Sequence, residues 1–139
     1  WAQKEYKNLQ KMRQAGVRVP EPIAVHRNLL LMEYLGDETM PAPTMKDLPI
    51  EDPATAYEDV VGSMAAMRKA ELVHGDLSEY NLLWWDGHPW VIDCAQAVPF
   101  AHPRSEDWFR RDVANVARYF AHLGVDTDAA RLEGRLRGG

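Results

Sequence analysis

The chain has 139 residues, which is enough for one domain and too few for two. Its 46% hydrophobic and 27% charged residues are ordinary for a globular protein and exclude a disordered tail, a collagen-like fibre and a coiled coil. The formal net charge of -5 argues against a protein that mainly binds the phosphate backbone of nucleic acids, and every apolar run is far shorter than the roughly 18 residues that span a bilayer.

The first part of the chain is predicted to form a helix followed by a pair of strands. Residues 2–15 carry Tyr, Leu and Met at three-residue spacing between Lys and Gln, which is typical of a helix, and Gly16 is suited to its C-terminal cap. Residues 23–26 and 29–35 have the composition of short strands, and Arg27–Asn28 between them predicts a hairpin.

A proline-containing loop, residues 36–49, leads into a long second helix. Asp52 and Pro53 match the N-cap and the first position of a helix, which we expect to continue to about Glu71. Residues 72–81 are polar and predict irregular structure. The side chains expected to face the core from this helix are Tyr57, Val60, Val61, Met64 and Met67.

The last part of the chain predicts a hairpin and two further helices. Residues 82–85 and 90–92 are expected to be short strands around an Asp-Gly turn. A long helix follows over residues 105–124, with Ser105 as its cap, and residue 126 or 127 starts a short last helix. This order of elements predicts an α+β fold. The inward side chains of the long helix are expected to be Trp108, Phe109, Val113, Val116, Phe120 and Leu123.

Cysteine usage is minimal, because Cys94 is the only cysteine in the chain. One cysteine can form neither an intrachain disulfide nor a four-cysteine zinc site. A single cysteine fits a reducing compartment, so we expect a cytoplasmic protein. We also expect a buried and inert thiol, because nothing near Cys94 in the sequence favours the thiolate.

The strongest functional signal is the segment His74–Asn81, with the sequence His-Gly-Asp-Leu-Ser-Glu-Tyr-Asn. Within it, Asn81 follows Asp76 by five residues, and further on Asp93 ends the apolar run of the second hairpin strand. A hairpin folds the ends of its strands together, so we expect these three side chains to converge. A lone Asp or Asn in a loop is usually a turn former or a cap, but this combination of spacing and strands favours a functional site.

Converging carboxylate and amide oxygens are the groups that phosphoryl transfer requires. One carboxylate orients the attacking hydroxyl or accepts its proton, while an amide oxygen and a second carboxylate hold Mg²⁺, which prefers oxygen ligands. Ordinary protein kinases carry His-Arg-Asp-Leu, an Asn four residues later, and a later Asp-Phe-Gly. Here Gly75 replaces the Arg, and Asp93-Cys94-Ala95 replaces Asp-Phe-Gly.

Taken together, the motifs resemble those of the RIO family of atypical serine/threonine kinases, and most of all its first subfamily. The resemblance covers nearly the whole chain and implies a protein-kinase-like fold, mainly the C-terminal lobe plus helix C and the adjoining strands of the N-lobe. It implies one partial kinase domain over 1–139, with 1–32 as the remainder of the N-lobe, 33–36 as the hinge and 37–139 as the C-lobe. The segments that carry the resemblance are 1–6, 19–23, 32–34, 74–81, 92–96, 102–103 and 111–115.

The resemblance also implies which groups react. Asp76 would be the catalytic aspartate, and Asn81 and Asp93 would bind Mg²⁺ or Mn²⁺ beside ATP. In the family the metal-binding aspartate can itself become phosphorylated, so Asp93 is also a candidate phospho-acceptor. The implied activity is that of a non-specific serine/threonine kinase or an ATPase.

The resemblance also implies further positions in nucleotide binding. Glu5 would be the glutamate of helix C, and Met32 would be the gatekeeper at the back of the adenine site. The backbone from Glu33 to Leu35 would be the hinge that binds adenine.

The first residues already resemble the interior of a domain, with no signal peptide before them, so we expect a fragment of a longer protein. The glycine-rich phosphate loop and the strand lysine of the family would precede Trp1, and we therefore expect the fragment alone to be inactive. The resemblance implies a role in maturation of the small ribosomal subunit, so the expected partner is a subunit precursor or a protein substrate. The sequence carries no nucleic-acid-binding motif of its own, and we expect no membrane partner.

Two alternatives stay open. Aminoglycoside and choline phosphotransferases also carry His-Gly-Asp and a later Ile-Asp, but they usually place Trp or Phe where this chain has Cys94. The second alternative is a non-catalytic assembly factor whose nucleotide pocket serves as a conformational switch. Cys94-Ala95 stands where the family often has Val-Ser or Phe-Ser, and Ala97 stands where Ser is common, so this chain lacks the family's hydroxyl groups at positions 95 and 97.

Several neighbours of the motif are expected to be structural. His74 should pack against the loop and hydrogen-bond to it rather than act as a base. Arg111 should be a structural charge that is paired near Asp112. The aromatic side chains expected to form core and cover around the hairpin are Trp84, Trp85 and Trp90.

Overall fold

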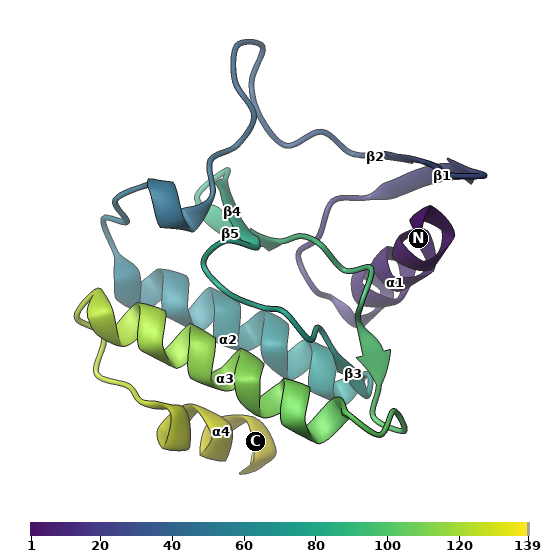
Figure 1. The fold of residues 1–139 in the computed structure, drawn as a ribbon. Helices are drawn as coiled ribbons and strands as arrows, with labels where there is room; N and C mark the ends of the chain where they lie inside the picture. The colour runs from purple at the N-terminus through teal and green to yellow at the C-terminus, as the bar shows by residue number, and fades with distance from the viewer. Residues whose placement is uncertain (139) are drawn as a thin grey trace.

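The computed structural model describes residues 1–138 and confirms the predicted α+β class (Figure 1). Its helices are α1 (Ala2–Ala15), the short 3-10 helix η1 (Met45–Asp47), α2 (Pro53–Lys69), α3 (Ser105–His122) and α4 (Ala129–Gly138). Its strands are β1 (Pro22–His26), β2 (Leu29–Met32), β3 (Leu72–Val73), β4 (Leu82–Trp85), β5 (His88–Val91) and β6 (Val98–Pro99).

The core lies among the helices, where α2 and α3 run side by side and α4 packs against α3 (Figure 1). Tyr57 of α2 meets Phe120 of α3 edge-on, with ring centroids 5.2 Å apart. Leu132 and Leu136 of α4 are buried against the same core. No helix within residues 1–138 is both long and apolar enough to cross a membrane.

The predicted core faces are largely confirmed, because all five side chains expected to point inward from α2 are buried. From α3, the expected residues Phe109, Val113, Val116 and Phe120 are buried, and Trp108 and Leu123 are half-buried.

Two predicted helix ends are confirmed by their caps. Gly16 ends α1 in the left-handed region with φ 93°, a conformation that glycine adopts at little cost. The carboxylate of Asp52 accepts the backbone N–H of Thr55 at 3.1 Å and so satisfies one of the free donors at the start of α2. This helix ends at Lys69, two residues before the predicted end at Glu71.

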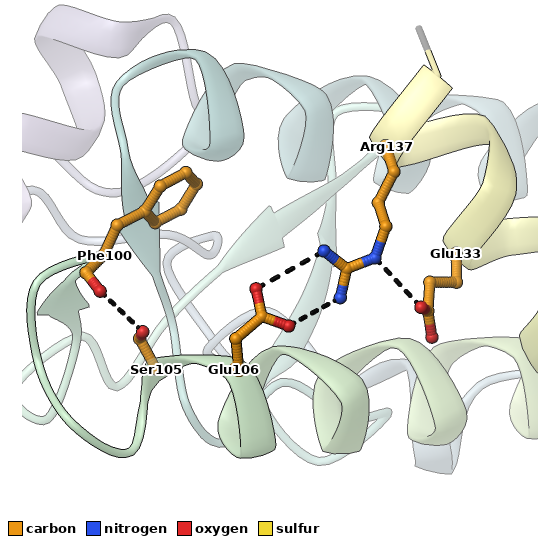
Figure 2. Close-up of polar contacts among 5 residues, drawn as sticks. All are labelled: Phe100, Ser105, Glu106, Glu133 and Arg137. Carbon is orange, nitrogen blue, oxygen red and sulfur yellow. Dashed lines mark hydrogen bonds and ion pairs between the residues drawn. The ribbon is translucent and has the colours of Figure 1, made fainter.

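Two predicted helix starts are wrong by a few residues. Ser105 is the first helical residue of α3 rather than its cap, and its hydroxyl donates to the carbonyl of Phe100 at 2.7 Å (Figure 2). Helix α4 begins after Asp128, whose carboxylate accepts the N–H of Arg131 at 2.8 Å. Of these two helices, only α4 therefore has a side-chain cap, from Asp128 rather than from Asp126 or Thr127, whereas no side chain caps the first turn of α3.

The two predicted hairpins are present with altered lengths. Strands β1 and β2 pair antiparallel from His26 opposite Leu29 to Pro22 opposite Met32. Strand β2 stops at Met32 rather than at Leu35. The next N–H, of Glu33, still donates to the carbonyl of Glu21 at 2.8 Å, but the N–H of Glu21 donates to the Glu33 carboxylate at 3.0 Å and not to the backbone. Strand β5 begins at His88, opposite Trp85 of β4, two residues before the predicted start.

One pairing was missed altogether. Strands β3 and β6 are two residues each and pair antiparallel, with Leu72 opposite Pro99 and Val73 opposite Val98. The segments lie far apart in sequence and are too short for a period-two pattern. Their pairing brings the two ends of residues 74–97 together, and this segment contains β4, β5 and the predicted motif from His74 to Asp93.

Candidate active site

His74 fixes the start of the loop that follows β3. Its side chain is fully buried, its Nδ1 accepts the backbone N–H of Asp76 at 3.1 Å, and its Nε2 lies 2.8 Å from the carbonyl oxygen of Ile92. An Nδ1 that accepts leaves Nε2 to carry the proton and donate to that carbonyl, which defines a neutral ring. The predicted structural role of His74 is therefore confirmed.

Asp112 of α3 binds the backbone of the same loop. Its two carboxylate oxygens accept the N–H groups of Gly75 and Leu77, each at 2.9 Å, and the residue is buried. Burial raises the pKa of the Asp112 carboxyl, and the two N–H donors oppose that rise. Arg111 donates to the carbonyl of Gly75 rather than pairing with Asp112, so α3 grips both sides of this glycine.

Gly75 is required where it stands. Its φ is +90°, and a Cβ atom there would lie only 2.8 Å from Cε3 of Trp108. The Trp108 ring is itself stacked on His102, with centroids 5.2 Å apart. The arginine of ordinary protein kinases could not occupy this position without moving Trp108.

Asp76 and Asn81 lie at the two ends of one tight loop. The Asn81 amide nitrogen donates to the Asp76 carbonyl at 2.7 Å and lies 3.2 Å from the Asp76 carboxylate. The Asp76 side chain is exposed, whereas Asn81 is buried. Because its nitrogen is used within the loop, the amide oxygen of Asn81 is the atom left for another ligand.

Asp93 lies just beyond β5 in a backbone conformation that is uncommon for a residue with a side chain, with φ 57°. The residue before it, Ile92, is fixed by Asn81, whose carbonyl accepts the N–H of Ile92 at 3.1 Å. The peptide after it is fixed by Glu5 of α1, whose carboxylate accepts the N–H of Cys94 at 3.1 Å. Asp93 therefore presents an exposed carboxylate from a backbone held on both sides.

Helix α1 makes a second contact with this segment that sequence reasoning missed. The side-chain amide of Asn8 donates to the carbonyls of Cys94, Ala95 and Ala97. The available signal was an Asn one turn after Glu5 inside a helix, where Asn is a poor helix former. The Cys94 thiol beneath is fully buried, as predicted, and burial raises its pKa with help from the Glu5 and Asp93 charges.

The structure brings the predicted carboxylates together. Glu5, Asp76 and Asp93 line one pocket of about 300 Å³, together with Trp1, Ala95 and Gln96. Three acidic groups from α1, the loop after β3 and the loop after β5 thus meet on one surface. Asn81 does not line this pocket, but its side-chain amide lies 3.2 Å from the carboxylate of Asp76, which does.

A second pocket, of about 240 Å³, adjoins the first and shares Glu5 and Asp93 with it. The predicted gatekeeper Met32 and the predicted hinge residues Glu33 and Leu35 all line it. Most of its remaining wall is apolar and comes from Leu9, Pro20, Tyr34, Pro41, Leu83 and Ile92.

The donor atoms fit a magnesium ion that is shared with a ligand. Within residues 1–138 no three His, Cys, Asp or Glu side chains gather closely enough to form a metal cage of their own. Mg²⁺ commonly uses one or two protein oxygens and takes its other ligands from water and phosphate. The Asp93 carboxylate and the Asn81 amide oxygen match that chemistry.

Comparison with known proteins identifies the family to which this chain belongs. The model of the RIO domain family matches residues 1–132. The chain belongs to the RIO family. Among curated relatives, the RIO-type serine/threonine-protein kinase Rio1 of Haloferax volcanii is 48% identical over 95% of this chain and 46% of its own length. Rio1 of Thermoplasma acidophilum is 39% identical over 95% of this chain and 69% of its own length.

Solved structures agree with the RIO domain assignment. The Rio2 kinase-ADP/Mg²⁺-phosphoaspartate complex from Chaetomium thermophilum superposes with a TM-score of 0.77 at 28% identity, covering 98% of this chain and 43% of that one. The predicted fold, a part of a protein-kinase-like domain, is thereby confirmed. The chain spans about half the length of the Haloferax relative. The division into lobes at residues 33–36 and the individual roles of the site residues stay predictions.

Proposed function

We propose that this RIO domain supplies the catalytic and nucleotide-binding groups of an ATP-dependent phosphotransferase, a serine/threonine kinase or ATPase of the RIO type. The observation that carries the proposal is the pair of adjoining pockets that share Glu5 and Asp93. An apolar pocket beside an acidic one suits a ligand with a flat base at one end and metal-bound phosphates at the other.

The backbone of the second pocket supports adenine binding. The N–H of Glu33 donates to the carbonyl of Glu21, and the carbonyl of Leu35 accepts the N–H of Ala42. Within residues 1–138 the Glu33 carbonyl and the Leu35 N–H have no hydrogen-bond partner, which leaves one acceptor and one donor. Adenine presents the complementary pair on one edge, an amino donor and a ring nitrogen acceptor.

The acidic pocket supports the chemistry. Asp76 would orient the attacking hydroxyl or water through its exposed carboxylate, which the Asn81 amide holds in place. Asp93 and Asn81 would hold Mg²⁺, or Mn²⁺ in its place, and a bound metal ion would neutralise the charge of the phosphates. The chain's own contribution is to keep these oxygens fixed before the ligand arrives.

Asp93 is also the proposed phospho-acceptor. One of its carboxylate oxygens would form a bond to the γ-phosphorus of ATP as the bond to the bridging oxygen breaks, which releases ADP. Water would then cleave the acyl phosphate and restore the carboxylate. The similar Rio2 kinase from Chaetomium thermophilum has been solved as an ADP/Mg²⁺-phosphoaspartate complex, which supports an aspartate as the acceptor here.

The remaining parts of the proposal concern the binding partner and the cellular location. A precursor of the small ribosomal subunit or a protein is the proposed partner, on the strength of the family alone. A cytoplasmic location is proposed because the single cysteine requires no oxidising compartment.

The test is the chemical nature of the phosphorylated product. Full-length protein is incubated with Mg²⁺ and ATP labelled in the γ-phosphate, then treated with hydroxylamine, which cleaves acyl phosphates and spares phosphoserine. We expect hydroxylamine-sensitive label that Asp93→Asn abolishes, and turnover reduced about 10²-fold by Asp76→Asn. Asp86→Asn, the same change in the exposed turn between β4 and β5, is the matched control and should leave both unchanged.

The other outcomes separate the alternatives. Hydroxylamine-resistant label on Ser or Thr would contradict the acyl phosphate and favour a plain protein kinase. Rapid phosphorylation of an added aminoglycoside or choline, without label on the protein, would favour a small-molecule kinase. Nucleotide binding without any transfer would favour the non-catalytic assembly factor.

A further inference from the structure

Asn8 makes an unusual set of contacts for one amide group. Its nitrogen lies 2.8 Å from the carbonyl oxygen of Cys94, 3.2 Å from that of Ala95 and 3.3 Å from that of Ala97. The residue is only 7% exposed, so water cannot take over these contacts. The two N–H donors of a single side chain on α1 therefore reach three carbonyls of the segment that follows Asp93.

We propose that Asn8 is a positioning residue for Asp93, which fixes the orientation of the metal-binding carboxylate from helix α1. The proposal rests on the proposed function, in which Asp93 binds the metal. Asn8 touches neither the ligand nor the reacting atoms, and it acts only through the backbone after Asp93.

The backbone of Asp93 needs such support. A left-handed φ on a residue with a side chain costs free energy and persists only when the surroundings over-determine it. The preceding residue, Ile92, is held by His74 on its carbonyl and by Asn81 on its N–H, both from the loop after β3. The following residue, Cys94, is held from α1 through Glu5 on its N–H and Asn8 on its carbonyl, which also accepts the N–H of Ala97 at 3.1 Å.

The division of labour between these two α1 residues follows from their chemistry. The Glu5 carboxylate is an acceptor and binds the N–H of Cys94, whereas the carbonyls on the other side require a donor. The amide of Asn8 donates without adding a positive charge beside Asp93. A carboxylate in place of Asn8 would face three carbonyl oxygens, and an apolar side chain would deprive the carbonyls of Ala95 and Ala97 of this donor.

The simpler interpretation is that Asn8 only stabilises the fold. The effect of Mg²⁺ on nucleotide affinity distinguishes a positioning role of Asn8 from a purely stabilising one. If Asn8 sets the orientation of Asp93, its loss should weaken the gain in ADP affinity that Mg²⁺ provides and leave binding of ADP alone unchanged. If Asn8 only stabilises the fold, both affinities should stay as in the wild type.

The experiment uses full-length wild-type protein and the variants Asn8→Asp and Asn8→Ser, with ADP binding measured by calorimetry in Mg²⁺ and in EDTA. We expect the Mg²⁺-dependent gain to fall about 10-fold or more in both variants, the range seen when groups behind metal ligands are removed. Gln10→Ala, on the exposed face of the same helix, is the matched control and should keep the full gain. If Asn8→Asp fails to fold, Asn8→Ser carries the test.

A ligand-free readout separates this proposal from the proposed function. Hydrogen exchange of the amides in residues 92–97 should accelerate in Asn8→Ser while exchange in α3 stays unchanged. A wild type without any Mg²⁺-dependent gain would refute the proposed function, whatever the exchange result. A wild type with the gain, and Asn8 variants that retain all of it or that exchange like the wild type, would refute the role of Asn8.

Discussion

The polar contacts that hold the reactive loops differ in kind from those that hold α4. Asp112 is 3% exposed, and its carboxylate binds backbone N–H groups of the loop that carries Asp76. By contrast, Arg137 of α4 binds Glu106 of α3 at 2.7 Å and Glu133 of its own helix at 2.9 Å, so that one guanidinium bridges two carboxylates (Figure 2). The Glu106 side chain is 59% exposed.

The difference shows where polar contacts determine the structure. A buried acceptor for a backbone N–H cannot be replaced by water, so its loss leaves an unsatisfied donor. An exposed ion pair exchanges freely with water and is weakened by salt. Helix α4 is therefore held mainly by Leu132 and Leu136, and the loop of Asp76 mainly by Asp112.

Replacing Asp112 by Ala should have the largest effect. Two buried N–H groups would lose their acceptor, and we expect a loss of about 3 kcal/mol in the free energy of unfolding. Urea denaturation of the full-length protein measures it. Asp107→Ala, an exposed carboxylate in the first turn of the same helix, is the matched control. Equal losses in the two variants would contradict the comparison.

Replacing Gly75 by Ala should have an intermediate effect. The new methyl group would meet Trp108 at 2.8 Å, and φ +90° is unfavourable for Ala, so we expect a cost of about 1–3 kcal/mol. Adding Trp108→Ala should couple with it, because the second change removes the clash but not the strained φ. Strictly additive free energies in this double-mutant cycle would show that Trp108 does not restrict residue 75.

Replacing Arg137 should have the smallest effect, at most about 1 kcal/mol. Arg137 also covers the ring of Phe109 at 4.9 Å from its centroid, so Arg137→Met, which keeps an apolar chain there, should cost less than Arg137→Ala. Thermal unfolding at low and high salt measures both. A loss as large as that of Asp112→Ala would overturn the comparison.

The ion pair between Arg137 and Glu106 predicts how stability depends on pH. The hydrogen bond from Arg137 lowers the pKa of Glu106 below its ordinary value of 4.5. The stability that it contributes is therefore present above pH 4.5 and is lost as the pH falls through the lowered pKa. In Arg137→Met this part of the acid dependence should disappear.

The elements that carry a local pattern could be predicted from the sequence. Asp52-Pro53 and apolar residues at helical spacing predict helix α2, and the Asp-Gly turn predicts the β4–β5 hairpin. The convergence of Asp76 and Asp93 follows from a hairpin that folds its ends together, and the structure places both on one pocket with Glu5. Their roles stay predictions.

What the sequence by itself determined is the set of chemical groups: two aspartates, an asparagine and a glutamate at fixed spacings, on elements set by short-range periodicity. Only the tertiary structure decided which side chains hold them. The contact between Asn8 and Cys94 joins residues 86 positions apart, and that between Asp112 and Gly75 joins residues 37 apart. Periodicity describes neighbours within a helical turn or a strand, whereas these contacts form only after the core has packed α1 and α3 against the loops.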